Sequence, residues 1–390
     1  MRHKNSVFHA VLATIPWGVF NRLVARYASD KHTRTLSTRT QLVVLLYGQL
    51  SGSASLQSIV GSFASHAARL YHLGVRAVKK STLADANRLR PSEVFSGLFA
   101  ALLQRAHPGL RRGIGECVYL IDSTSIRLNR LSEDWARFSA ELCGAKVHVI
   151  YDPDADCPIY AAITPQRTND ITAAQAMPIQ PGATYVFDLG YYDYGWWAEL
   201  DEAGCRIVTR FKSNTPLTIE TERLIPPGGI VISSATILSD RTGYLPARQA
   251  NRRANPMQRL VREVRVRLET GKILRILSND LTASAQEIAD LYKRRWAIEL
   301  FFRWIKQTLK IRHFIGQSEN AVRIQIAVAL IAFLLLRLAQ AAQHLVRSPL
   351  RFAQLVQTNL MHRKPIQSLI APGPEPPDLP DHRQGSLQWA

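Results

Sequence analysis

Residues 292–310 constrain the fold most, because their pattern predicts a helix that is apolar along both flanks. At about 100° of rotation per residue, six polar side chains share one face of this helix: Tyr292, Arg295, Glu299, Arg303, Lys306 and Lys310. Apolar side chains border that face, with Ile298, Phe302, Ile305 and Leu309 on one side and Trp296, Leu300 and Trp304 on the other. Such a helix packs inside a domain, and a row of cations around one carboxylate indicates a polyanion and a metal ion.

The same row also has a purely structural interpretation. Arg295 and Arg303 stand four residues before and after Glu299, which is the spacing of ordinary helix salt bridges. Both interpretations stay open on this helix alone, so the choice depends on the rest of the chain.

The positive charge of the chain is concentrated near its N-terminus. The formal net charge is +19, and residues 1–115 contribute +13 of it, from 16 Lys and Arg against Asp30, Asp85 and Glu93. A segment of this kind indicates a polyanionic partner such as DNA. A membrane surface is the alternative, but the basic residues are dispersed through helical patterns and do not gather beside an apolar stretch.

Composition indicates a globular protein. A chain of 390 residues, 46% of them hydrophobic, predicts two or three folding units. The four cysteines have no C-x-x-C spacing, which argues against a zinc or redox motif. The apolar run 327–336 is shorter than the roughly 20 residues of a membrane span and predicts a core helix. We expect no membrane segment, no signal peptide and a cytoplasmic location.

Residues 1–112 are predicted to be helical throughout and to form a DNA-binding domain. Thr82 and Asp85 suit a capping box after the basic stretch 75–80. This step favours either a helix-turn-helix or an ordinary helical bundle with a basic face.

From residue 117 the pattern changes to short strands. These are expected at 117–121, 146–151, 158–164, 184–188 and 205–211, with short helices at 170–177 and 194–203. The acidic turn 152–156 lacks the Gly and the final Glu of a calcium loop, so it predicts a hairpin. Three strands, a helix, a strand, a helix and a strand form the order of an RNase H-like α/β fold, a mixed sheet with flanking helices.

Residues 212–283 are predicted to form a β-rich insertion that interrupts this core, with a hairpin turned at Thr270 and Gly271. A capping box from Ser284 to Glu287 then opens the helix that carries Glu299. The core is therefore expected to comprise residues 116–211 plus 284–348. Residues 364–390 are Pro-rich without apolar periodicity and predict a disordered tail.

Two further carboxylates follow apolar strand patterns. Asp122 follows residues 118–121 and Asp188 follows residues 185–187. Taken singly, each has the alternative role of capping a turn at the end of a strand. Together with Glu299 they provide enough oxygen ligands for two Mg²⁺ ions, with Mn²⁺ as a substitute, and such a pair supports phosphodiester cleavage.

The spacing Tyr292-x2-Arg295-x3-Glu299-x6-Lys306 resembles the signature of DDE transposases of bacterial insertion sequences, of the insertion-sequence family four type. The similarity extends over about residues 116–345, and Asp188-Leu189-Gly190-Tyr191 resembles the second motif of that family. The resemblance implies an RNase H-like catalytic core. It also implies that Asp122, Asp188 and Glu299 bind the metal ions.

By the same resemblance, Tyr292, Arg295 and Lys306 would grip the phosphates and the distorted transposon end. Arg303 and Lys310 share their face and are further candidate DNA contacts. In relatives a Trp in the insertion helps a hairpin intermediate to form, but residues 212–282 contain no Trp.

Lys146 and His148 alternate along the second predicted strand, so they point to one face. They either face the DNA backbone or form a satisfied pair on the strand.

The sequence therefore predicts a transposase that recognises the terminal inverted repeats of its element, cuts beside them and transfers the 3′-hydroxyls into target DNA. Both ends must be held together, so we expect a homodimer on DNA. Two alternatives stay open: an RNase H-like nuclease without strand transfer, and an inactive DNA-binding relative that acts as a repressor.

Overall fold

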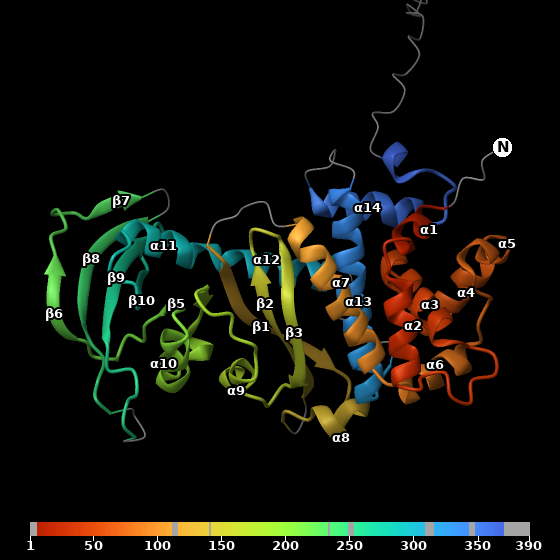
Figure 1. Ribbon diagram of the computed structural model, residues 1–390, viewed down its shortest axis with the longest axis horizontal. Helices are drawn as coiled ribbons and strands as arrows, with labels where there is room; N and C mark the ends of the chain where they lie inside the picture. Colours follow the sequence, from red (N-terminus) through yellow and green to blue (C-terminus); the bar gives the residue numbers. More distant parts are fainter. Residues whose placement is uncertain are drawn as a thin grey trace, which may run out of the picture.

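The computed structural model describes residues 6–110, 116–139, 142–232, 235–248, 253–308, 316–342 and 348–369. Helices gather at one end of an elongated molecule, and a single sheet extends to the other end (Figure 1). Within the described part of the predicted tail, residues 366–369 form the 3₁₀ helix η4 (Ile366–Leu369), and Ile366 is buried. The boundary predicted at residue 364 is therefore too early, because the chain still contributes to the core there.

The N-terminal region is helical, as predicted. Its α-helices are α1 (Val7–Leu12), α2 (Trp17–Arg26), α3 (Thr38–Ser51), α4 (Leu56–Ser65), α5 (Ala67–Leu70), α6 (Lys80–Leu89) and α7 (Glu93–Leu110), with the 3₁₀ helix η1 (Tyr71–Leu73) after α5. Ser37 caps α3 by accepting a hydrogen bond from the Thr40 N–H. The predicted capping box at Thr82 is wrong, because α6 already begins at Lys80 and has no side-chain cap.

Helix α13 (Glu319–Ala341) is the centre of the helical end, where it packs against α3, α6 and α7, and α14 (Pro349–Asn359) packs beside it. Among the described residues, α13 is long and apolar enough to cross a membrane. So are α3 and α4 together, if their 98° bend is counted within one span. However, 78% of the apolar window of α13 is buried inside the protein. It is the core helix that the run 327–336 predicts.

Five strands form the mixed sheet of an RNase H-like fold. They are β1 (Val118–Leu128), β2 (Cys143–Asp152), β3 (Cys157–Pro165), β4 (Thr184–Phe187) and β5 (Arg206–Arg210), in the spatial order β3-β2-β1-β4-β5. The first three are antiparallel neighbours, whereas β4 lies parallel to both β1 and β5. A short helical segment between β1 and β2 comprises η2 (Arg130–Ser132) and α8 (Glu133–Ala136).

Both faces of this sheet are covered, which explains the nearly continuous apolar runs of its central strands. Tyr119 and Tyr185 belong to the core shared with α9 (Asp170–Gln175) and α10 (Tyr194–Glu202). The alternate residues Leu120 and Val186 belong to the opposite core, shared with α11 (Ala285–Arg294) and α12 (Trp296–Thr308). The period of two along each strand therefore separates the two helical layers.

The predicted β-rich insertion consists of strands, but it does not form a separate sheet. Its strands are β6 (Thr218–Arg223), β7 (Ile230–Ile232), β8 (Ala235–Tyr244), β9 (Leu260–Leu268) and β10 (Ile273–Ser278). The predicted hairpin is β9 and β10, with Gly271 at φ 82° in their turn. Strand β10 pairs antiparallel with β5, so the insertion continues the sheet as β5-β10-β9-β8-β6, and β7 pairs with β8 (Figure 1).

The acidic turn between β2 and β3 is a hairpin turn, as predicted. Its three Asp side chains each contact a different helix. Asp152 accepts a hydrogen bond from His107 of α7 at 2.7 Å. The next acidic residue, Asp154, pairs with Arg294 at the end of α11 at 2.5 Å, and Asp156 pairs with Arg337 of α13 at 3.3 Å. The turn therefore joins the helical end of the molecule to the segment that leads into Glu299.

Candidate active site

Asp122 and Asp188 lie side by side because of the strand register. Leu120 of β1 is the partner of Val186 in β4, and each Asp follows two residues later along a parallel direction. Side chains two residues apart on a strand share a face, so Asp122, like Leu120, faces the layer of α11 and α12. Asp188 lies just beyond the end of β4 and caps the 3₁₀ helix η3 (Leu189–Tyr191). Asp122 lies within β1 and not at its end, contrary to the prediction, since β1 continues to Leu128. The edge beside Asp122 is nevertheless open, because β4 ends at Phe187.

The predicted helix 292–310 is divided in two at Arg295. Helix α11 ends at Arg294 and α12 begins at Trp296, and the hydrogen bonds around the junction span only three residues. The Arg295 guanidinium donates to Asp122 Oδ2 at 3.2 Å and to Glu299 Oε1 at 2.5 Å. Arg295 therefore brings the strand carboxylate and the helix carboxylate to one point. The contact between Arg295 and Glu299 is the i,i+4 salt bridge that the purely structural interpretation of this helix predicts.

The three carboxylates influence one another electrostatically. Burial raises the pKa of Asp122 to about 6; the Ser123 N–H and Arg295 oppose this rise, while Asp188 and Glu299 add to it. Carboxylates that are crowded and partly desolvated in this way are stabilised by a cation. Their oxygens are also the ligands that hard divalent ions prefer. The donor set therefore fits Mg²⁺ chemically.

The carboxylates do not form a closed metal cage in this conformation. Within the described ranges, no group of three or more His, Cys, Asp or Glu side chains is close enough to hold an ion. Between Asp122 and Glu299 the positive charge comes from Arg295. Its Nε is buried and has no hydrogen-bond partner among the residues that the structure describes.

Gly190 leaves room for two carboxylates. Asp188 accepts a hydrogen bond from the Gly190 N–H at 2.8 Å, and the φ of Gly190 is not positive. A Cβ on this glycine would lie 3.1 Å from Asp188 Oδ1 and 3.2 Å from Asp170 Oδ2. A side chain at this position would therefore crowd both carboxylates.

Asp170, which sequence reasoning missed, lies at the start of α9 and faces the candidate site. Its Oδ1 accepts hydrogen bonds from Ser123 Oγ at 2.8 Å and from Lys146 Nζ at 3.1 Å. An acidic residue in the first turn of a helix is common, so its sequence position carried no functional signal. Only the pairing of β2 with β3 brings this turn back to β1.

The DNA contact predicted for His148 is wrong for this conformation, because its side chain is wholly buried. Its Nε2 lies 2.8 Å from Thr164 Oγ1, and Asp170 is 3.6 Å from its Nδ1. Lys146 points to the same face, as the alternation predicts, but it bonds Asp170 and the Thr168 carbonyl. The alternation of residues along β2 correctly predicts that Lys146 and His148 share a face. It contains no information about α9, which covers that face.

We expect His148 to make the protein less stable as the pH falls from about 6.5 to 4. Burial lowers the pKa of His148 to about 4; Asp170 opposes this effect and Lys146 adds to it. The unfolded state, with a pKa of about 6.5, binds the proton first in this window. The free energy of unfolding therefore falls with pH, by up to about 3 kcal/mol.

Denaturant unfolding of the wild type and of His148→Gln at several pH values measures this effect. The variant should have a flatter profile between pH 4 and 6.5, whereas the exposed control His362→Gln should follow the wild type. If the free energy of unfolding depended on pH in the same way for His148→Gln and the wild type, His148 would not be buried as a neutral imidazole.

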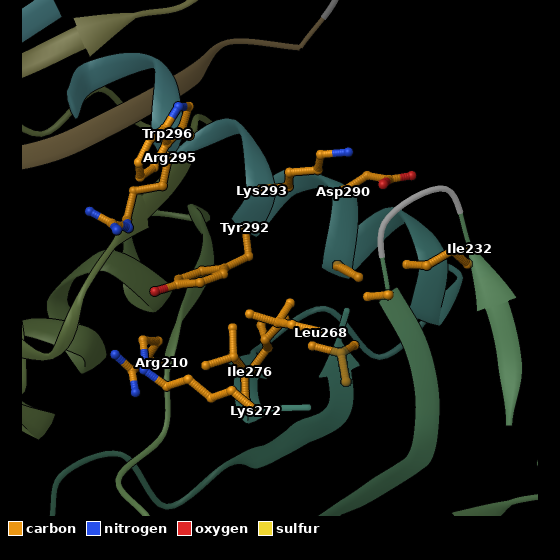
Figure 2. Close-up of a pocket in the computed structure, with 14 residues that line it drawn as sticks. Arg210, Ile232, Leu268, Lys272, Ile276, Asp290, Tyr292, Lys293, Arg295 and Trp296 are labelled. Carbon is orange, nitrogen blue, oxygen red and sulfur yellow. The ribbon is translucent and has the colours of Figure 1, made fainter. Parts of the chain in front are cut away.

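A cavity of about 450 Å³ lies between α11, the start of α12 and the insertion strands, and Arg295, the partner of Asp122 and Glu299, is one of its lining residues. Apolar side chains such as Val266 and Ile276 line its interior. Figure 2 shows the Tyr292 ring lying across the cavity, between Arg295 and Arg210. Two of the predicted DNA contacts therefore meet at an apolar hollow with a cationic border.

The other predicted contacts lie further along α12. Arg303 is exposed and lies over the Trp296 ring at 5.7 Å, and Lys306 is half-buried. Lys310 lies outside the described residues.

Comparisons with known proteins identify a transposase domain in this chain. Residues 113–335 match the family model of the transposase DDE domain, and residues 3–76 match a domain of unknown function, DUF4372. The Sinorhizobium fredii (strain NBRC 101917 / NGR234) protein y4zB, assigned as a transposase, is 41% identical over 302 residues, which cover 77% of this chain and 82% of that protein.

A Geobacillus stearothermophilus protein, assigned as the transposase of insertion sequence element IS5377, is 29% identical over 265 residues, 66% of each chain. Among solved structures, the piggyBac transposase synaptic complex with hairpin DNA aligns with 97% of this chain and 84% of that chain. The TM-score is 0.47 and the sequence identity is 12%.

Proposed function

The chain belongs to the DDE transposase family of insertion sequences, and from that premise we propose that it cuts DNA beside the terminal inverted repeats of its own element and joins the freed 3′-hydroxyls to target DNA. The observation that carries the proposal is the meeting of Asp122 and Glu299 at Arg295, with Asp188 beside Asp122 in register. Strand β1, the residue that follows β4 and helix α12 each contribute one carboxylate to the proposed site.

In each cut, a water oxygen bonds to the phosphorus and the bond between phosphorus and the 3′-oxygen breaks. The products are a 5′-phosphate and a free 3′-hydroxyl. That hydroxyl then attacks a phosphodiester of the target strand, whose own 3′-oxygen leaves. When bound, two Mg²⁺ ions, or Mn²⁺ in their place, activate the attacking oxygen and stabilise the leaving one. Asp122, Asp188 and Glu299 would hold them.

Arg295 is proposed to exchange partners during this reaction. Without DNA it neutralises Asp122 and Glu299. Its planar guanidinium also suits two-point binding to a phosphate. Once other cations neutralise the carboxylates, Arg295 can bind the phosphate of the transposon end.

The DNA path is proposed to run along the cavity and α12. Tyr292 and Arg295 border the cavity, while Arg303 and Lys306 continue the basic row along the helix. Lys146 is a weaker candidate, since Asp170 holds it. The basic N-terminal region would bind the terminal repeats, and two copies would hold the paired ends. We propose the cytoplasm as the place of action.

Purified full-length protein, duplexes carrying the terminal inverted repeats and a target plasmid test this function. We expect cut ends and covalently joined products with Mg²⁺ or Mn²⁺, and neither product after chelation. Duplexes with scrambled repeats serve as the matched control. Sedimentation of the complex on paired ends measures whether two copies bind.

The products separate the alternatives. Cuts without joined strands would indicate an RNase H-like nuclease, and repeat binding without cuts would indicate a repressor. Either result, obtained with both metals, would contradict the proposed strand transfer.

A further inference from the structure

Tyr191 places its hydroxyl in the interior of the protein. Its side chain is 1% exposed, and its hydroxyl has no partner within the part of the chain that the structure describes. Contacts with Phe187 and Trp196, at ring separations of 6.1 and 6.3 Å, hold the ring in place. A buried polar group of this kind is rare in native proteins and indicates a missing ligand or water.

Three carboxylates lie near enough to the Tyr191 hydroxyl to act on it electrostatically. Burial raises its pKa well above the usual range, and Asp122, Asp170 and Asp188 raise it further. Ser123 is near enough to oppose this rise, but its hydroxyl donates to Asp170 and makes no hydrogen bond of ordinary geometry with Tyr191.

Asp170 presents one oxygen to the same space. Ser123 and Lys146 both donate to Oδ1, whereas no hydrogen bond from the described residues reaches Oδ2. Oδ2 and Asp188 Oδ1 lie within 3.2 Å of one point beside Gly190. Lys146 offsets the charge of Asp170, which makes a fourth carboxylate tolerable beside Asp122 and Asp188.

We propose that Asp170 and Tyr191 form an outer layer of the cation site, where Asp170 Oδ2 and the Tyr191 hydroxyl accept hydrogen bonds from a water bound to the cation. This inference rests on the proposed function, because it requires Asp122 and Asp188 to hold a divalent ion. Mg²⁺ usually keeps several of its waters, and the protons of those waters need acceptors. Partners of this second layer typically change metal affinity by about 10 to 100-fold.

The alternative is purely structural: Asp170 is only the salt-bridge partner of Lys146, and Tyr191 is only a core tyrosine. Metal binding distinguishes the two interpretations, because a structural role would not change the affinity of a correctly folded protein for the ion.

The test is calorimetric titration of Mn²⁺ into the DNA-free full chain at constant pH. We expect Asp170→Asn to weaken binding by about 10 to 100-fold and Tyr191→Phe by about tenfold, with the stoichiometry unchanged. Matched controls are Tyr194→Phe, whose hydroxyl bonds Tyr192, and Glu202→Gln on the exposed side of α10. Both controls should bind Mn²⁺ as the wild type does.

Two further measurements keep the outcome unambiguous. Thermal unfolding without metal should leave Tyr191→Phe at least as stable as the wild type, since the change removes an unpaired buried hydroxyl. Its stabilisation by Mn²⁺ should be smaller than that of the wild type. The luminescence lifetime of bound Tb³⁺ in H₂O and D₂O counts metal-bound waters, and Asp170→Asn should leave that count unchanged.

Unaltered Mn²⁺ affinity in both variants would overturn the inference. An additional metal-bound water in Asp170→Asn would also overturn it, because Asp170 would then bind the ion directly. Failure of the proposed function gives a different result: a wild type without Mn²⁺ binding, or an Asp188→Asn variant that binds like the wild type. That result would remove the cation site itself.

Discussion

Replacement of Asp188 by Asn is expected to lower the rates of end cleavage and strand transfer by about 10³-fold or more. The change removes one negative charge from the proposed metal ligands. Bound metal ions stabilise the transition state by several kcal/mol. Each 1.36 kcal/mol of lost stabilisation lowers the rate about tenfold. Folding should be retained, because the Asn carbonyl can still accept the Gly190 N–H that Asp188 binds at 2.8 Å. Single-turnover assays on paired ends measure the effect.

Glu202→Gln is the matched control for this experiment, since it removes one negative charge from the exposed surface of α10. The cleavage and strand-transfer rates of Asp122→Asn and Glu299→Gln should fall as far as those of Asp188→Asn. A rate within tenfold of the wild type for Asp188→Asn, in a protein with an unchanged melting temperature, would remove Asp188 from the catalytic set.

The largest effect on stability is expected from Asp240→Ala in β8. Asp240 accepts two hydrogen bonds, each of 2.7 Å, from Nε and Nη2 of Arg262 in β9. The Arg262 side chain is 0% exposed and that of Asp240 is 4% exposed. Truncating one partner leaves a buried charge without its counter-ion, which costs about 3–5 kcal/mol of the free energy of unfolding. Denaturant titration measures this loss.

A more exposed pair, formed between β8 and β6, provides the comparison. Arg241 donates to Glu222 at 2.8 Å, with side chains 25% and 50% exposed, so Glu222→Ala should cost no more than about 1 kcal/mol. Replacing Asp240 and Arg262 together by Leu and Met should recover much of the loss, because no buried charge is then left unpaired. Arg223, which also pairs with Asp240 at 3.3 Å, has a side chain that is 43% exposed and can be solvated by water. Equal losses for Asp240→Ala and Glu222→Ala would mean that water reaches the buried pair.

The sequence predicted those features that depend on local pattern. Apolar runs before Asp122 and Asp188 identified the central strands, and the spacing around Glu299 identified the helix beside them. Register then brings the two Asp residues together, and register follows from period-two burial. These features were predictable because each depends on a few neighbouring residues.

The remaining features depend on contacts between distant segments. The pairing of β10 with β5 joins two strands that each look complete in the sequence. The position of Asp170 beside Lys146 depends on how β2, β3 and α9 pack together. The helix is divided at Arg295, where this residue bonds both Asp122 and Glu299. No periodicity within one segment contains this information.

The pairing of β5 with β10 also means that the insertion is not a detachable module. Ile276 faces Arg210, and Ser278 faces Val208, in one ladder of backbone hydrogen bonds. If residues 212–283 were deleted, β5 would become a bare edge with unpaired N–H and C=O groups, which invites association with other chains. The insertion therefore shields the catalytic sheet from aggregation, and a shortened relative would need another way to cover that edge.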